Sequence, residues 1–215
     1  LVCILGGIVC TVSRKGIITA GLAFFLYFIF KKKFKYVLVS ILVFLCVAGV
    51  IASHSVMSQR FTSDRLAVQF EGKASMAIAG IEMFLDSPLI GIGYQGYYEN
   101  FGKYFPGAPR KKYDAHNMYI TVLANSGLLG FIPFMAVFFY PLFIGFRALW
   151  GSSSGYSADM AIICIISIIT FMFNGFYGGG LFVYYPIMIL FYTNIALLFS
   201  YEQDTCRPAA LMKNR

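Results

Sequence analysis

Long apolar runs constrain this chain more than any other feature of its sequence. A transmembrane helix needs about 20 predominantly apolar residues, and several of the runs approach that length. They cover residues 1 to 12, 16 to 30, 36 to 52, 118 to 143, 160 to 173 and 181 to 200. The pattern predicts an all-α integral membrane protein, a polytopic helical bundle of about six transmembrane helices.

Charged residues are too scarce to coat a soluble globule of this size. They make up 12% of the chain, against about 25% in a typical soluble domain. The net charge of +8 would suit nucleic acid, but no basic stripe alternates with stacking aromatic residues on a soluble face. We therefore expect the lipid bilayer as a partner and exclude nucleic acid.

The basic cluster KKKFK, residues 31 to 35, joins two apolar runs and orients the chain. The positive-inside rule assigns so short a basic loop to the cytoplasm, and alternation places the rest. The predicted parts are transmembrane helices in residues 1 to 52, an extracytoplasmic loop with an interfacial helix in 53 to 117, transmembrane helices in 118 to 200 and a cytoplasmic tail in 201 to 215.

The first run opens on Leu1, without a methionine or the positively charged region that begins a signal peptide. We expect the chain to be the C-terminal part of a longer protein, whose N-terminal half is then a partner of this one.

The extracytoplasmic loop holds most of the charge. Its helix spacing after Lys73 ends at Ser87-Pro88, which predicts a helix along the outer membrane surface. The glycine-rich turn that follows, with Gly91 and Gly93, could bring backbone N–H groups to an anion, although such turns are more often only turns. The basic residues of the loop form either a solvated surface with its acidic residues or an anion site; they are Arg60, Arg65, Lys73, Lys103, Arg110, Lys111 and Lys112.

Arg14 and His116 are expected at one depth, the outer edge of the bilayer. Arg14 precedes the lysine cluster by roughly 22 Å of helix, and an arginine there needs protein, water, an anion or lipid headgroups. His116 is expected at the start of a membrane-entering helix capped by Asp114. Small residues on the same stripe, Gly127 and Gly130, predict that His116 faces the bundle.

Cations converging with one base suit a reaction on a lipid-linked diphosphate. The cations would neutralise the leaving diphosphate, and the base would take a proton from an attacking hydroxyl. The sequence has no His, Cys or carboxylate cluster with metal-ligand spacing near these groups. We therefore expect a reaction without metal or cofactor.

Three segments, in this order, resemble the O-antigen ligase/polymerase superfamily of bacterial membrane glycosyltransferases. They are "TVSRKGIITAGLAFFL", "EGKASMAIAGIEMFLDSPLIGIGYQGYYENF" and "DAHNMYITVLANSGLLGFIPF", and the resemblance covers most of residues 10 to 140. It implies transfer of a glycan from undecaprenyl diphosphate to a saccharide acceptor at the outer face of the bacterial cytoplasmic membrane.

The same resemblance implies roles for single residues. Arg14 would bind diphosphate, and His116 would act as base or orient the acceptor. Asn117, Gly91 and Gly93 match further positions of the family pattern. Two departures stand out. Lys73 stands where the family has an arginine, and Arg60, Arg65 or Arg110 could take over the role of that arginine. An extra Lys15 follows Arg14.

Several functions fit this pattern. We favour a repeat-unit polymerase, because the outer loop is short for docking a large acceptor. A ligase that moves polymer onto the lipid A core and a protein O-oligosaccharyltransferase are the alternatives within the resemblance. Outside it, the chain could be part of a transporter or flippase for an anionic lipid-linked substrate, or a membrane anchor without activity.

Overall fold

The computed structural model describes residues 14–53, 63–106, 112–113, 115–151, 156–178 and 188–200. All regular structure in these ranges is helical. The helices are α2 (Arg14–Phe30), α3 (Phe34–Ser53), α5 (Ser63–Asp86), α6 (Gly96–Tyr104), α7 (Met118–Gly151) and α8 (Tyr156–Gly175), followed by a helical segment at Met188–Ser200. The all-α prediction is confirmed for the described part of the chain.

Two of the helical stretches are long and apolar enough to cross a membrane, Met118–Trp150 and Ala158–Gly175. Lys15–Phe30, Phe34–Val43 and Met188–Ser200 are apolar but shorter. The prediction of about six spans exceeds these two and stays a prediction. The run at 1 to 12, residues 181 to 187 of the last run, and the tail from 201 fall outside the described residues.

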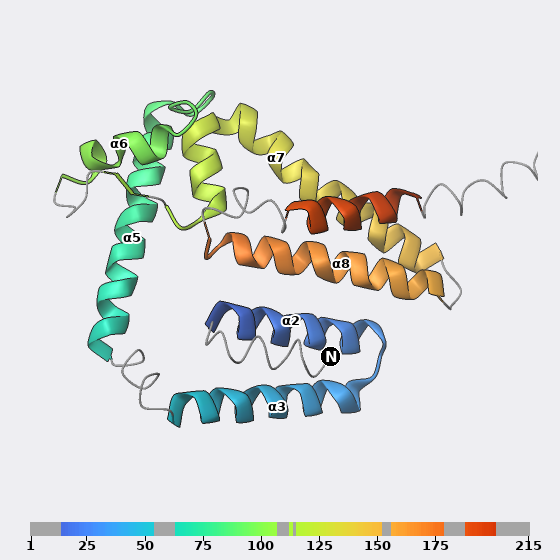
Figure 1. Ribbon diagram of the computed structural model, residues 1–215. Helices are drawn as coiled ribbons and strands as arrows, with labels where there is room; N and C mark the ends of the chain where they lie inside the picture. The colour runs from blue at the N-terminus through green and yellow to red at the C-terminus, as the bar shows by residue number, and fades with distance from the viewer. Residues whose placement is uncertain are drawn as a thin grey trace, which may run out of the picture.

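The helices form two groups that run crosswise to one another (Figure 1). α2 packs against α3 and α8, and α8 packs against α7, so these apolar helices make one bundle. α5 lies across the end of that bundle, at the N-terminal end of α2 and the C-terminal end of α8 (Figure 1). The predicted surface helix forms the second part of α5, which begins earlier, at Ser63, and ends as expected at Asp86, directly before Ser87-Pro88.

The two groups have separate hydrophobic cores. Between α5, α6 and the start of α7, buried side chains gather around Tyr97 and Phe101. Between α7, α8 and the segment Met188–Ser200, Phe138, Phe171 and Phe191 stack with centroid distances of 4.3 to 5.9 Å. The start of α7 contributes to both cores and therefore joins them.

The helix α7 is broken at Gly127, whose φ of 58° and ψ of −162° are not helical. The loop after α5 closes the break with backbone hydrogen bonds. The N–H groups of Leu128 and Leu129 donate to the carbonyls of Pro88 and Leu89, at 2.8 and 3.0 Å. One continuous helix from residue 118 was expected, with Gly127 and Gly130 as a packing stripe. That prediction is wrong, because the loop takes the place of the missing helical hydrogen bonds.

Candidate functional site

The glycine-rich turn after α5 is a structural joint. The N–H groups of Gly91, Ile92 and Gly93 donate to the carbonyls of Ser87, Ala124 and Asn125, each at 2.9 Å. All three donors are therefore taken by protein, and none is left to bind an anion. The physical basis for predicting an anion-binding turn at Gly91 and Gly93 does not hold.

The amide of Asn125 extends this joint to α6. Its Oδ1 accepts a hydrogen bond from the backbone N–H of Tyr97 at 2.8 Å, and the Tyr97 hydroxyl donates to the Met76 carbonyl of α5 at 2.7 Å. The first part of α7 is thus fixed to α5 and α6 together. This fixed unit carries the loop in which His116 lies.

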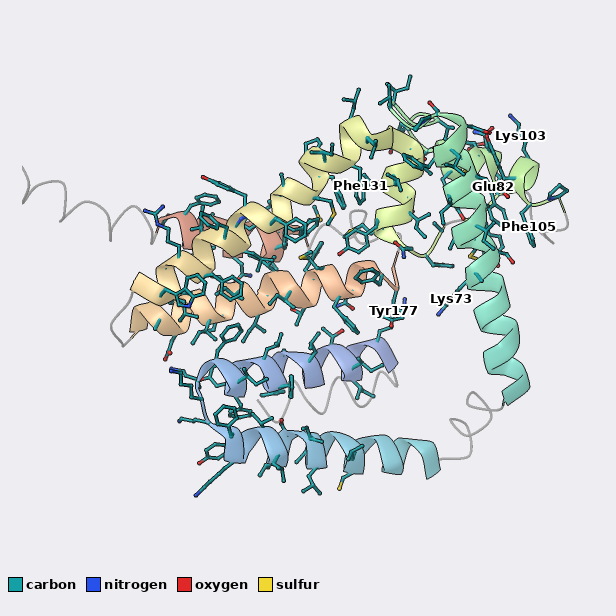
Figure 2. All side chains as sticks on the ribbon, turned by 180° about the vertical axis from the view of Figure 1, so that it is seen from behind. Lys73, Glu82, Lys103, Phe105, Phe131 and Tyr177 are labelled. Carbon is teal, nitrogen blue, oxygen red and sulfur yellow. The ribbon has the colours of Figure 1, made fainter. Side chains whose placement is uncertain are left out.

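Two lysines and one tyrosine converge where α5 crosses the bundle. The Lys15 ammonium, at the start of α2, donates to the backbone carbonyl of Tyr177, just after α8. Lys73 of α5 lies over the ring of the same Tyr177, with its Nζ 5.9 Å from the centroid. Figure 2 shows Lys73 and Tyr177 pointing toward one another from the two groups of helices. We call Lys15, Lys73 and Tyr177 the cation cluster.

The cation cluster brings like charges together. Lys15 and Lys73 contact the same residue, Tyr177, one at its carbonyl and the other at its ring, and each keeps part of its surface exposed. An anion between them would remove the repulsion. Arg14 begins α2 beside Lys15, but its side chain falls outside the described residues.

The ends of α2, α7 and α8 are fastened together next to this cluster. The Thr19 hydroxyl of α2 bonds to Oδ1 of Asn174 in α8 at 3.2 Å. The Tyr119 hydroxyl of α7 donates to the Met172 carbonyl of α8 at 2.7 Å. Gly175 leaves room for α7, since a Cβ there would lie 2.6 Å from Cε of Met118. The start of α7 therefore rests on the end of α8.

His116 lies in the loop just before α7, held on both sides. Ala115 is buried in the core of α5 and α6, and Met118 is fully buried against α8. Between them the His116 side chain is exposed, with its ring 6.4 Å from that of Tyr113 in an edge-on arrangement. Its φ of 48° is left-handed, a conformation uncommon outside glycine and often kept at functional sites.

The cap of α7 is Asn117. Its Oδ1 accepts hydrogen bonds from the N–H groups of Tyr119 and Ile120 at 3.0 and 3.2 Å, the arrangement of an N-cap. The prediction of Asp114 as the cap is wrong, and Asp114 itself lies outside the described residues. His116 consequently precedes the helix. The expectation that it faces the bundle from the first turn of α7 is wrong.

The remaining predicted cations are not placed at the cluster. Arg60 and Arg110 fall outside the described residues, and Arg65 lies in the first turn of α5 with a side chain that is not described. The sequence did not predict that Lys73 lies near Lys15 and Tyr177. The extra Lys15 was noticed as a departure from the family pattern, whereas Tyr177 sits in an aromatic run that resembles any other interfacial one.

Other charged groups form an ordinary surface around α6. Lys112 pairs with Glu99 at 2.5 Å and lies over Tyr98, and the hydrogen bond that it donates to the Glu99 carboxylate raises the pKa of Lys112. The Tyr104 hydroxyl donates to Asp86 at 2.6 Å, and this bond raises the pKa of Tyr104. For Lys112 the solvated mixed-charge surface is therefore the correct interpretation.

An apolar cavity of about 380 Å³ lies between α2, α3 and α8. It begins at Ile18, which follows Lys15 by one turn of α2. Its described lining is apolar apart from one hydroxyl; the residues are Ile18, Gly21, Leu22, Phe25, Ser40, Ile41 and Phe173. Nowhere in the described ranges do three or more His, Cys, Asp or Glu residues gather as metal ligands.

Apolar helices with cations gathered at one end define a helical, membrane-associated class of protein. A family model described as O-antigen ligase matches residues 1–135. The chain therefore belongs to the O-antigen ligase family, as its motifs suggested. Searches of curated proteins and of solved structures gave no match.

Proposed function

We propose that this chain carries catalytic residues of a glycosyltransferase of the bacterial cytoplasmic membrane. The enzyme would move a glycan from undecaprenyl diphosphate to an acceptor hydroxyl at the outer face, as a polymerase of polysaccharide repeat units. The observation that carries the proposal is the cation cluster, which lies one turn of α2 before an apolar cavity and next to the end of α8, on which the start of α7 rests.

A lipid-linked diphosphate has two chemically different ends, and the site offers a place for each. Lys15 and Lys73 supply positive charge for the diphosphate, and Arg14 at the start of α2 would add a bidentate donor. The cavity beginning at Ile18 supplies apolar walls for the adjoining part of the prenyl tail. The cations would bind more tightly as negative charge develops on the leaving diphosphate, which lowers the barrier.

The exposed His116 supports the other half of the reaction. The acceptor hydroxyl would attack the anomeric carbon, so that a new carbon–oxygen bond forms as the bond to the diphosphate oxygen breaks. The hydroxyl proton would pass to the neutral imidazole of His116, and the electron pair would leave with the lipid diphosphate. A base in this position typically contributes about 10² to 10⁴-fold in rate.

The exposed position of His116 also favours transfer over transport. A base that faces water beside a cation cluster can meet a sugar hydroxyl from the aqueous side. A flippase would instead need its charged groups along a path through the bilayer. Between Ile17 and Phe30 of α2, and between Asn117 and Phe146, the sequence has no charged residue.

The test uses the natural full-length protein in cells that lack their own copy. We expect His116→Asn to abolish chain elongation, because asparagine keeps the left-handed backbone but cannot act as a base at neutral pH. Single repeat units should then accumulate in place of the polysaccharide ladder on a gel. Lys112→Gln is the matched control, since its partners are Glu99 and Tyr98, and it should give a normal ladder.

A double variant, Lys15→Gln with Lys73→Gln, tests the cation cluster separately. Loss of elongation at normal protein level supports the diphosphate site, and a normal ladder rules it out. Long polymer left on undecaprenyl diphosphate would identify a ligase, and loss of glycan from a protein acceptor would identify an oligosaccharyltransferase. Repeat units trapped on the cytoplasmic face would identify a flippase.

A further inference from the structure

The bend of α7 carries an apolar surface that none of the described residues covers. Around Gly127, large aliphatic side chains from the loop after α5 and from the second part of α7 point outward. Ile90 is 69% exposed and Leu129 is 65% exposed. We call this surface the bend patch; it consists of Leu85, Leu89, Ile90, Leu128, Leu129 and Ile132.

The two parts of the bend patch are held together as one surface. Leu128 and Leu129 donate their N–H groups to Pro88 and Leu89, so the loop and the helix cannot move independently. A Cβ on Gly127 would lie 2.4 Å from the carbonyl carbon of Leu89, which shows how closely the backbones meet. The loop lies at the bend at the top of Figure 1.

Four backbone polar groups at the helix break are paired within the protein, while the side chains of the bend patch are exposed. The helix break frees carbonyls and N–H groups, and those of Ala124, Asn125, Leu128 and Leu129 are paired with the loop. Pro88 has no N–H to pair. Water would satisfy such groups without help, whereas hydrocarbon demands that they be satisfied within the protein.

Charge is absent from the two segments that carry the bend patch apart from Leu85, which ends α5 beside Asp86. Residues 87 to 98 and 117 to 146 contain no Asp, Glu, Lys, Arg or His. The flanking acids are paired, Asp86 with Tyr104 and Glu99 with Lys112. Tyr94, at the edge of the patch, is 92% exposed, and tyrosine favours the headgroup level of a membrane.

We propose that the bend patch inserts into the hydrocarbon of the outer leaflet, with Tyr94 at the headgroups. The patch continues the exposed apolar face of the membrane-crossing part of α7, so lipid that surrounds the helix also covers the loop. The segment after α5 therefore dips into the membrane, although the sequence placed it wholly in the extracytoplasmic loop. Because the loop directly follows α5, its insertion sets the depth of α5 and of Lys73.

Tryptophan quenching tests this insertion directly. The described chain has its one tryptophan at position 150. In a background where Trp150 and any tryptophan of the rest of the full-length protein are replaced by Phe, Ile90→Trp places a fluorophore on the patch. Lys103→Trp places a matched one on exposed α6. The full-length protein is reconstituted into vesicles of phosphatidylcholine, with and without bromine on the acyl chains. We expect Ile90→Trp to emit at shorter wavelength and to lose most of its emission in brominated lipid, while Lys103→Trp keeps its emission.

Two results would overturn the proposal. Long-wavelength emission from Ile90→Trp, unchanged by bromine, would place the patch in water. Short-wavelength emission that bromine does not quench would show another protein segment or a second copy covering it. A Phe139→Trp variant, on the exposed apolar face of α7 outside the bend patch, should be quenched in either case and confirms that the protein is inserted. The proposed enzymatic function is independent of these outcomes, because none of these residues belongs to the cation cluster.

Discussion

Gly91 and Gly127 allow two stretches of backbone to touch. Both have positive φ, 68° and 58°, and a Cβ on either would lie 2.4 Å from a backbone carbon of the other segment. Any side chain would therefore push the loop and the helix break apart. The contact exists because hydrogen atoms alone occupy these two positions.

We expect Gly127→Ala to destabilise the protein by about 2 kcal/mol or more, from backbone strain and from the clash with Leu89. Gly72→Ala is the matched control, because a Cβ there meets nothing within 4 Å and Gly72 lies within α5. That change should stabilise by about 0.5 to 1 kcal/mol. Thermal unfolding in detergent measures both, and equal melting temperatures for the two variants would contradict the close contact.

The sequence predicted residue types better than residue roles. The cluster of glycines after Pro88 correctly indicated a turn, but its partners lie more than 30 residues away, at 124 to 129. Local sequence carries no information on such a contact. Similarly, Asp114 and Asn117 are both good N-caps, and only the packing of Ala115 and Met118 determines where α7 begins.

At the scale of the elements, α7 is a helix that is interrupted at Gly127 by hydrogen bonds to the loop after α5. Its first part lies with α5 and α6, and its second part belongs to the apolar bundle. Apolar residues run through the break without interruption, so periodicity predicted one helix. By contrast, the end of α5 was predicted well, because it is marked by Ser87-Pro88 and the buried face repeats at helical spacing. Its start was not, since α5 begins at Ser63, ten residues before the predicted stretch.

The first part of α7 depends on its cap. Asn117→Ala removes the acceptor for two N–H groups and should cost about 1 kcal/mol in stability. Asn117→Asp keeps the acceptor and should restore the melting temperature. Thermal unfolding of both variants separates this structural role from any role in binding substrate, which would be lost in both. Equal stability of Asn117→Ala and the parent would contradict the capping role.

In the whole molecule, opposite charges and like charges mark opposite ends of the bundle. Lys31 and Asp159 form an ion pair between α2 and α8 at one end. Lys15 and Lys73 meet at the other end, across which α5 lies. Alternation of the apolar runs predicted that the KKKFK cluster and the loop of residues 53 to 117 lie on opposite sides of the membrane, and which end faces the cytoplasm stays a prediction.

Cysteine labelling in intact cells tests that orientation. In a background without native cysteines, Lys103→Cys on α6 should react with a membrane-impermeant maleimide. Lys33→Cys, in the turn between α2 and α3, should react only after the cells are opened. Both positions are exposed in the structure, so access alone separates them. Labelling of Lys33→Cys first would reverse the assigned topology.

The joint between residues 88–93 and 124–129 also bears on how the chain is made. Because the loop precedes the break in the sequence, the ribosome releases the loop first. When the second part of α7 leaves the insertion machinery, the carbonyls of Pro88 and Leu89 already exist to receive it. The hydrogen-bond acceptors of the loop are therefore synthesised before the segment that binds to them. The break in α7 can form without any later part of the chain.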